Sequence, residues 1–188
     1  MVRKALILYG TRFGATARTS DEIASVLRGE GIDVQVVNAK ENKINDISEF
    51  DLVIVGTGIM INKGTGEPDK FLKRFQKELA NKALALFVSA GGLALAEREG
   101  KMDEIESTRQ KHLKNKAAKY NLNPVAMGLF SGVWDFNRLP WWSKKAMSGL
   151  KQKLEEAGFK ETQPGIYDTR DCEAIQSWAK DLVEIPTK

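Results

Sequence analysis

The stretch GTRFGATA, residues 10–17, places two glycines, two threonines and an arginine directly after the apolar run at 5–9. A helix-like polar stretch follows, and the first N–H groups of a helix have no partners within it. A phosphate can bind there, with the hydroxyls of Thr11 and Thr16 as further donors and glycine allowing close backbone approach. The same residues also fit a plain strand-to-helix turn capped by a threonine. This stretch alone therefore leaves both interpretations open.

Competing phosphate-binding motifs do not match this chain. The sequence contains no G-x-x-x-x-G-K-[ST] loop, and no G-x-G-x-x-G follows the first apolar run. The second predicted strand ends in Asn38 rather than in an acid, which argues against the usual dinucleotide site. A phospho-acceptor receiver domain would need acids where the chain has Tyr9-Gly10 and Gly56-Thr57.

The elements that must position this loop follow from the hydrophobic periodicity. We expect strands at 4–10, 32–39, 51–57, 83–90 and 124–132, and helices at 14–29, 67–80, 97–119, 140–157 and 170–184. Asp168 or Thr169 is the expected cap of the last helix. This alternation predicts an α/β fold: a five-stranded parallel sheet with helices on both faces, in a single domain over residues 1–188. Ligands bind such sheets at the carboxyl ends of the strands, where the glycine-rich segments 10–16, 56–66 and 89–92 lie.

The loop TRFGAT, residues 11–16, resembles the FMN phosphate loop of flavodoxins, T/S-x-T-G-x-T. VGTGIMINKG (55–64, the second loop) and SAGG (89–92, the third loop) stand where that family's other flavin loops lie. The order of elements is similar over the whole chain. The chain is most similar to the branch of menaquinone-dependent protoporphyrinogen oxidases, through YGTRFGAT, the G-x-x-I pattern of Gly56–Ile59, the aromatic and basic WDFNRLPWWSKK, and the tail YDTRDCEAIQSWA.

The resemblance implies non-covalent FMN binding in this flavodoxin-like fold. The implied contacts come from Thr11, Arg12, Phe13, Gly14, Ala15, Thr16, Thr57, Gly58, Ile59, Met60, Ser89, Ala90, Gly91, Gly92 and Trp134. Phe13 departs from the family, which usually has a hydroxyl or an acid there. The second and third loops also lack the aromatic residues that flavodoxins commonly stack on the ring. Two alternatives remain open: Ile59, Met60 and Leu93 face the ring, or Trp134 and Phe136 reach it.

The segment 133–154 has a second set of candidate residues. Trp142 falls on the apolar stripe of the predicted helix and is expected in the core. Trp141 lies beside that stripe, and Arg138, Lys144 and Lys145 are close in sequence. A tryptophan with basic neighbours suits a membrane surface, an acidic substrate or a partner protein. A tryptophan at the edge of the core is the alternative.

Three further features are expected to carry no chemistry. His112 lies in a lysine-rich stretch and is predicted to be a solvated surface histidine. Cys172 is the single cysteine and is interpreted as inert. The acids within 97–106 are expected to form a solvated helix face, and no metal site is predicted.

Composition narrows the class of function. The chain has 188 residues and a net charge of +4, which favours acidic partners but is too weak to indicate nucleic acid. No run approaches the about 20 apolar residues that span a bilayer. We expect a cytoplasmic protein, with peripheral binding to the inner face of the membrane as the alternative.

The first hypothesis for the function is an FMN-dependent oxidoreductase that oxidises a small molecule and passes electrons to a quinone, as the resemblance implies. The second is a flavodoxin-type electron carrier between redox proteins, without a substrate of its own. The third is a binding module that kept the fold without the flavin. The charge and the segment 133–145 favour the first hypothesis.

Overall fold

Five parallel strands buried on both faces form the centre of the molecule. The structure, a computed structural model, describes residues 2–12, 14–60, 63–138 and 141–185, and the side chains of all of these except 141–148. The sheet order is β2-β1-β3-β5-β6, and every pair on this path is parallel. The strands are β1 (Lys4–Gly10), β2 (Asp33–Asn38), β3 (Leu52–Met60), β5 (Ala83–Ala90) and β6 (Ala126–Ser131). This is the predicted fold, with a flavodoxin-like strand order.

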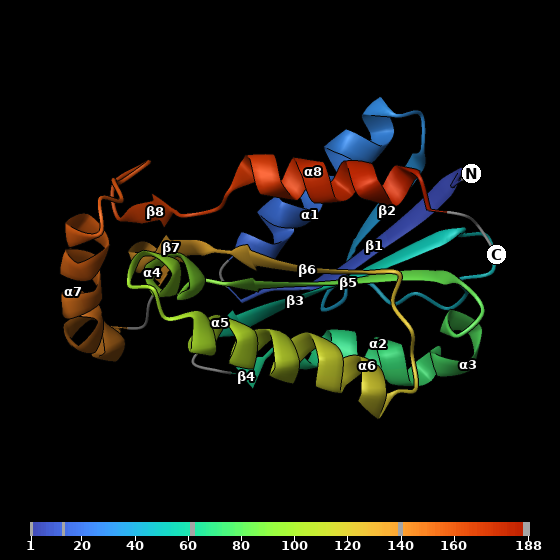
Figure 1. Cartoon of the computed structure of the whole chain (residues 1–188), viewed down its shortest axis with the longest axis horizontal. Coiled ribbons are helices and arrows are strands. Elements are labelled where there is room, and N and C mark those ends of the chain that lie inside the picture. Colours follow the sequence, from blue (N-terminus) through green and yellow to red (C-terminus); the bar gives the residue numbers. More distant parts are fainter. Residues whose placement is uncertain (1, 13, 61–62, 139–140, 186–188) are drawn as a thin grey trace.

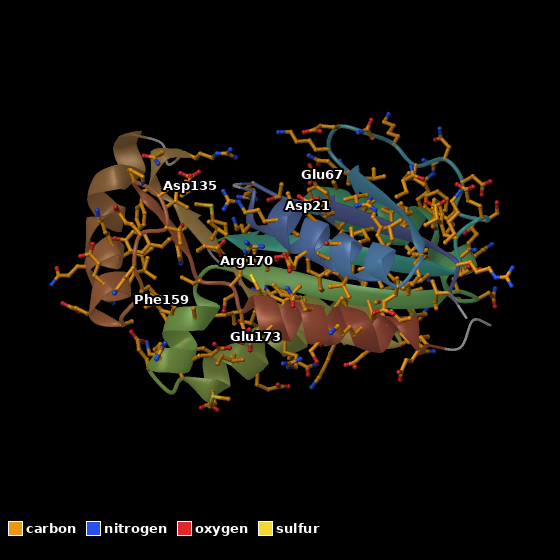
Figure 2. All side chains as sticks on the ribbon, turned by 90° about the horizontal axis from the view of Figure 1, so that it is seen from above. Asp21, Glu67, Asp135, Phe159, Arg170 and Glu173 are labelled. Carbon is orange, nitrogen blue, oxygen red and sulfur yellow. The ribbon has the colours of Figure 1, made fainter. Side chains whose placement is uncertain are left out.

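Helices cover both faces of the sheet (Figure 1). One face carries α1 (Ala15–Gly29) and α8 (Cys172–Val183), which lie side by side (Figure 2). The other face carries α2 (Gly66–Arg74), α3 (Gln76–Leu79), α5 (Met102–Arg109), the π-helical turn η1 (Gln110–Lys114) and α6 (Asn115–Lys119).

Alternate residues of each strand supply the two cores between sheet and helices. On β1, Ile7 packs with Ile23 and Leu27 of α1, whereas Leu6 packs in the core that contains Phe71 of α2. Burying each of these large side chains contributes about 1.5–3 kcal/mol. The two cores hold the carboxyl ends of β1, β3 and β5 at one edge, where the loops of interest begin.

A third, smaller core lies beyond that edge. β7 (Val133–Asp135) pairs antiparallel with β8 (Ile166–Asp168), and η2 (Phe136–Arg138) and α7 (Trp141–Glu156) lie between them in sequence. Buried residues of α4 (Leu93–Arg98), α7 and β8 meet there, with Tyr167 and Leu154 almost fully enclosed. Figure 1 shows α7 at the end of the molecule opposite α3.

Several sequence-based predictions about elements need correction. The helix expected at 97–119 is interrupted at Gly100, whose φ of 67° is left-handed, and the helix expected at 67–80 divides at Phe75. The last helix begins at Cys172 and is capped by Asp171, whose side chain accepts from the Ala174 N–H at 2.9 Å. The short strands β4 (Lys63–Gly64), β7 and β8 were not predicted, because two or three residues give no readable periodicity.

The prediction for His112 was wrong, since this side chain is only 7% exposed. It lies in η1, and a π-helical turn shifts the register of the residues that face the sheet. His112 and Leu113 are thereby both buried. Burial lowers the pKa of His112, with Lys111 and Lys116 adding to the effect.

Candidate functional site

The predicted phosphate loop, residues 11–16, connects β1 to α1 with a left-handed glycine at the helix start. Gly14 is the N-cap of α1 and has a φ of 92°, a conformation that favours glycine. Its N–H donates to the Thr11 Oγ1 at 2.9 Å. The Thr11 hydroxyl therefore accepts from its own loop and keeps its hydrogen for donation to a ligand.

Thr16 is the most informative side chain of this loop. It is 1% exposed, and its Oγ1 has no hydrogen-bond partner among the described residues. A Cβ added to Gly58 of β3 would lie 2.6 Å from that Oγ1, so Gly58 leaves space beside the hydroxyl. Leaving a buried hydroxyl without a partner costs about 1–3 kcal/mol. An anion that accepts from Thr16 at the N-terminus of α1 would remove that cost.

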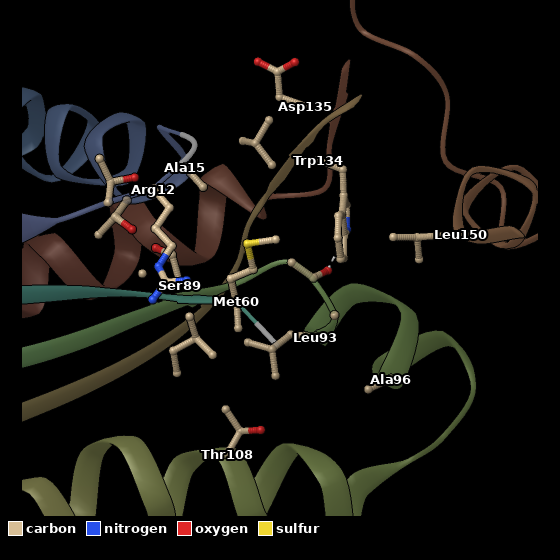
Figure 3. Close-up of a pocket in the computed structure, with 18 of the residues that line it drawn as sticks. Arg12, Ala15, Met60, Ser89, Leu93, Ala96, Thr108, Trp134, Asp135 and Leu150 are labelled. Atoms are coloured by element: carbon tan, nitrogen blue, oxygen red, sulfur yellow. Dashed lines mark hydrogen bonds between the residues drawn. The ribbon is translucent and has the colours of Figure 1, made fainter. Parts of the chain in front are cut away.

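A cavity of about 650 Å³ begins at this loop and runs along the carboxyl edge of the sheet (Figure 3). Its lining comes from all three predicted loops, from α4, α5 and α7, and from the segment after β6. A volume of this size accommodates a cofactor-sized ligand.

Most of the predicted flavin contacts line this one cavity. They are Thr11, Arg12, Ala15, Thr16, Gly58, Ile59, Met60, Ser89, Ala90, Gly91, Gly92 and Trp134. Gly14 and Thr57 are not in the lining: Gly14 forms the helix cap, and the Thr57 Oγ1 accepts from the Lys116 Nζ at 3.2 Å. Phe13 lies outside the described residues.

Both sets of candidate ring contacts reach the cavity. Leu93, at the start of α4, and Phe136, in η2, join Ile59, Met60 and Trp134 in the lining. The aliphatic and the aromatic candidates for ring contact therefore line the same cavity, so neither set is excluded.

Trp134 is fixed against the third loop by a hydrogen bond and by close packing. Its Nε1 donates to the Gly91 carbonyl oxygen at 2.9 Å, and a Cβ on Gly91 would lie 2.7 Å from its ring. Trp134 also pairs across strands with the buried Tyr167. In Figure 3 its ring stands opposite Leu150 of α7. The β7–β8 strand pair therefore positions an indole at the cavity wall.

Seven lining residues were missed by sequence reasoning: Ala96, Glu104, Ser107, Thr108, Val133, Asp135 and Leu150. Three of them, Glu104, Ser107 and Thr108, share one face of α5 at helical spacing. That spacing was visible in the sequence, but a helix that is polar nearly all round gave no sign of which side faces a cavity.

Arg138 lies near the phosphate loop. Its Nη1 would be 3.6 Å from a Cβ on Gly14, and its Nε is 3.2 Å from the Asp135 Oδ2. Arg138 was predicted to act together with Trp141, Lys144 and Lys145. The side chains of these three residues lie outside the described part of the structure, as does that of Trp142.

A local ion pair orders the turn between β8 and α8. Arg170 donates from Nε and Nη2 to the two carboxylate oxygens of Asp168, at 2.9 and 2.7 Å, and Arg18 of α1 lies 3.8 Å from the same carboxylate. Burial raises the pKa of Asp168, but the Arg170 hydrogen bonds outweigh burial and leave that pKa below its ordinary value. The end of β8, which pairs with β7, thus lies within ion-pair distance of α1.

Other potential functional features are limited. Cys172 is exposed, and the acids of 97–106 are exposed as predicted, although Glu104 also borders the cavity. The described residues contain no cluster of three or more His, Cys, Asp or Glu side chains that could hold a metal ion. None of the helices described is long and apolar enough to cross a bilayer.

Comparison with known proteins agrees with this architecture. Protoporphyrinogen IX dehydrogenase [quinone] of Escherichia coli K12 is 24% identical over 185 residues, which cover 98% of this chain and 97% of that protein. A short-chain flavodoxin associated with a non-canonical PDU bacterial microcompartment superposes with a TM-score of 0.58 at 13% identity, over 97% of each chain. Fusobacterium nucleatum flavodoxin bound to flavin mononucleotide gives a TM-score of 0.51 at 14% identity, over 98% of each chain.

The family assignment rests on a match over most of the chain. A family model for the flavodoxin domain matches residues 6–161, which include β2, β3, β5, β6, most of β1 and all three loops at their carboxyl ends. The observed order β2-β1-β3-β5-β6 is the flavodoxin-like order. The chain therefore belongs to the flavodoxin domain family.

Proposed function

We propose that this protein binds FMN in the 650 Å³ cavity and acts as a quinone-linked oxidoreductase. The observation that carries the cofactor assignment is the buried Thr16 hydroxyl at the N-terminus of α1, which has no hydrogen-bond partner in the described part of the chain. Thr11, Thr16 and the backbone N–H groups at the start of α1 would hold the phosphate. FMN binding by the Fusobacterium nucleatum flavodoxin, which shares the fold, supports this proposal.

The other end of the cavity would hold the flavin ring. Ile59, Met60 and Leu93 offer aliphatic contacts, and Trp134 and Phe136 offer aromatic ones. FMN supplies the redox chemistry when bound, whereas the chain supplies binding, orientation and exclusion of water. The hydrogen bond from Trp134 to Gly91 would keep the third loop in place during turnover.

The size and lining of the cavity favour an enzyme over a carrier. A carrier between proteins needs an exposed edge of its flavin but no space for a second small molecule. Here the lining also includes Ala96 and Leu150, with Ser107 and Thr108 as polar groups, in addition to the residues proposed to contact the ring. An apolar wall with a few hydroxyls suits a flat, largely apolar substrate.

The similarity to the Escherichia coli quinone-dependent protoporphyrinogen IX dehydrogenase supports a porphyrinogen as that substrate and a quinone as the acceptor. We propose a cytoplasmic location with access to quinone at the inner face of the membrane. The second candidate function, a flavodoxin-type electron carrier, is supported by the TM-score of 0.58 to a short-chain flavodoxin.

An anaerobic turnover assay tests the enzyme hypothesis. The FMN-loaded protein is mixed with protoporphyrinogen IX and a soluble menaquinone analogue, and formation of the fluorescent porphyrin is followed. We expect turnover that requires both the FMN-loaded protein and the quinone. Free FMN and the Thr16→Ala variant, at an FMN concentration too low to load it, are the controls.

Two results would contradict the enzyme hypothesis. If free FMN supports the same rate as the loaded protein, the chain contributes no catalysis. If the loaded protein accepts electrons from a flavodoxin-reducing enzyme but never from the porphyrinogen, the carrier function is favoured. If the protein binds no FMN, the remaining hypothesis is the flavin-free binding module.

A further inference from the structure

A second cavity adjoins the first and has a different chemical character. It is an open groove of about 560 Å³ between β4, the start of α2 and the η1–α6 segment. Arg12 of the phosphate loop lines both cavities. The two spaces therefore meet at one side chain, and a single ligand could extend from one into the other.

The lining of the groove is strongly basic. Its cationic side chains are Arg12, Lys63, Lys111, Lys116 and Lys119, and among the described residues that line it Asp69 is the one carboxylate. The lining thus carries an excess of four positive charges, as large as the +4 of the entire chain. The groove is therefore a site of local positive charge.

The one carboxylate already has a cationic partner. The Asp69 Oδ1 lies 2.6 Å from the Lys116 Nζ, which also donates to the Thr57 Oγ1 at 3.2 Å. Lys116 is only 11% exposed, so this pair belongs to the buried base of the groove. Asp69 therefore neutralises Lys116 and leaves the charges of Lys63, Lys119 and Arg12 without a compensating acid in the lining.

His112 adds a buried imidazole to the same groove. It is 7% exposed, and burial lowers its pKa, with Lys111 and Lys116 contributing in the same direction. The lowered pKa favours the neutral form of the His112 imidazole. The groove combines a buried polar base with exposed cations at its rim, which is the arrangement of a site for an anion rather than of an evenly solvated helix face.

We propose that this basic groove binds the anionic groups, carboxylates or phosphates, of the small molecule that exchanges electrons in the adjoining cavity. This proposal rests on the proposed function, because it takes the first cavity as the redox site. The anionic groups of the ligand meet Arg12, Lys63 and Lys119, where the groove adjoins the larger cavity. Ammonium and guanidinium groups bind such anions through charge-assisted hydrogen bonds.

The test uses the full chain loaded with FMN and a matched pair of double variants. The groove variant is Lys63→Gln with Lys119→Gln. The control variant is Lys77→Gln with Lys180→Gln, which removes the same charge from exposed positions on α3 and α8, outside the linings of both cavities. Mesoporphyrin IX, a redox-inert dicarboxylate, its uncharged dimethyl ester and inorganic pyrophosphate are the probes, and each dissociation constant is measured at low and high salt.

We expect the groove variant to bind mesoporphyrin IX about tenfold more weakly at low salt, because two cationic contacts are lost. The dimethyl ester should bind the wild type and the groove variant equally, and high salt should reduce the difference for the diacid. The control variant should match the wild type. A loss confined to pyrophosphate would assign the groove to a phosphate-bearing ligand, which the proposal includes.

The proposal is overturned if the diacid, the ester and pyrophosphate each bind equally to the wild type and the groove variant, or if no anionic probe binds the wild type. The lysines are then a solvated helix face. FMN affinity separates this failure from failure of the proposed function, because the groove variant should bind FMN as the wild type does. If the wild type binds no FMN, the pyrophosphate titration of the same chain still tests the groove.

Discussion

The two ends of the larger cavity are built in different ways. The phosphate end consists of consecutive residues, 11–16, between one strand and one helix, with Gly58 as a neighbour. The far end is assembled from α4, α5, β7 and α7, which are far apart in the sequence. Local sequence thus encodes the group that would hold the cofactor, whereas long-range packing encodes the wall that would select the substrate.

The largest expected effect is at the phosphate end. Replacing Thr16 with Ala removes a hydroxyl that would donate to a charged group, so FMN binding should weaken by roughly 1.5–3 kcal/mol. Riboflavin, which lacks the phosphate, should bind the variant and the wild type equally. Calorimetric titrations with both ligands measure the change in each affinity. If the variant loses the same affinity for FMN and for riboflavin, Thr16 does not act through the phosphate.

The stability of the ligand-free protein provides a control for this variant. The Thr16 Oγ1 has no partner among the described residues, so its removal breaks no hydrogen bond that the structure describes. Thermal unfolding of Thr16→Ala without FMN should therefore occur at or above the wild-type temperature, because the variant no longer buries an unpaired hydroxyl. A large destabilisation would mean that the hydroxyl has a structural role.

The converse experiment addresses the far end. Trp134→Phe keeps an aromatic ring but removes the Nε1 hydrogen bond to the Gly91 carbonyl. We expect flavin binding to weaken by about 1 kcal/mol. Because the indole would contact the flavin ring, which FMN and riboflavin share, the binding of both ligands should weaken by the same factor. Parallel titrations with the two ligands check this. If only FMN binding weakens, Trp134 acts on the phosphate and not on the ring.

The ion pair between Asp168 and Arg170 at the end of β8 should make stability depend on pH. Asp168→Asn removes the carboxylate that Arg170 grips, and we expect the free energy of unfolding to fall by about 1 kcal/mol at neutral pH. The pKa of Asp168 lies below its ordinary value, so the charge stabilises the fold above the unfolded-state pKa and ceases to do so as pH falls through the folded-state pKa.

The difference between the wild type and Asp168→Asn should therefore shrink below about pH 4. Urea unfolding at a series of pH values measures it. A difference that stays constant down to the most acidic values would show that the ion pair contributes nothing and that side-chain packing alone is affected.

The smallest effect is expected for Arg138→Gln. The Arg138 guanidinium lies near Gly14 but is 63% exposed, so its contribution to phosphate binding should be about 0.5 kcal/mol and should vanish at high salt. FMN titrations at two salt concentrations check this. If FMN affinity is unchanged but the KM for the porphyrinogen rises, Arg138 contacts the substrate, as predicted from the sequence.

The sequence was sufficient to predict the sheet and the position of residues 11–16 between the first strand and the first helix. Buried parallel strands are continuous apolar runs, and the residues of the phosphate loop are adjacent in the chain, so both leave a local signal. The five strands and most of the loop residues that line the cavity were accordingly predicted.

The far end could not be predicted in the same way. β7 and β8 are three residues each and pair across about thirty residues of chain, so neither has a period of its own. The stripe of Glu104, Ser107 and Thr108 faces a cavity only because α5 packs beside α4. The burial of His112 depends on the π-helical register of η1, which the lysines around it conceal in the sequence.

The central claim is that FMN is held by its phosphate at the N-terminus of α1. The most direct test is the ratio of the dissociation constants of riboflavin and FMN for the wild-type protein, measured by calorimetry in phosphate-free buffer. The account predicts that FMN binds at least about tenfold more tightly, because hydrogen bonds to a charged phosphate contribute roughly 1.5–3 kcal/mol each. Equal affinity for the two ligands would contradict it.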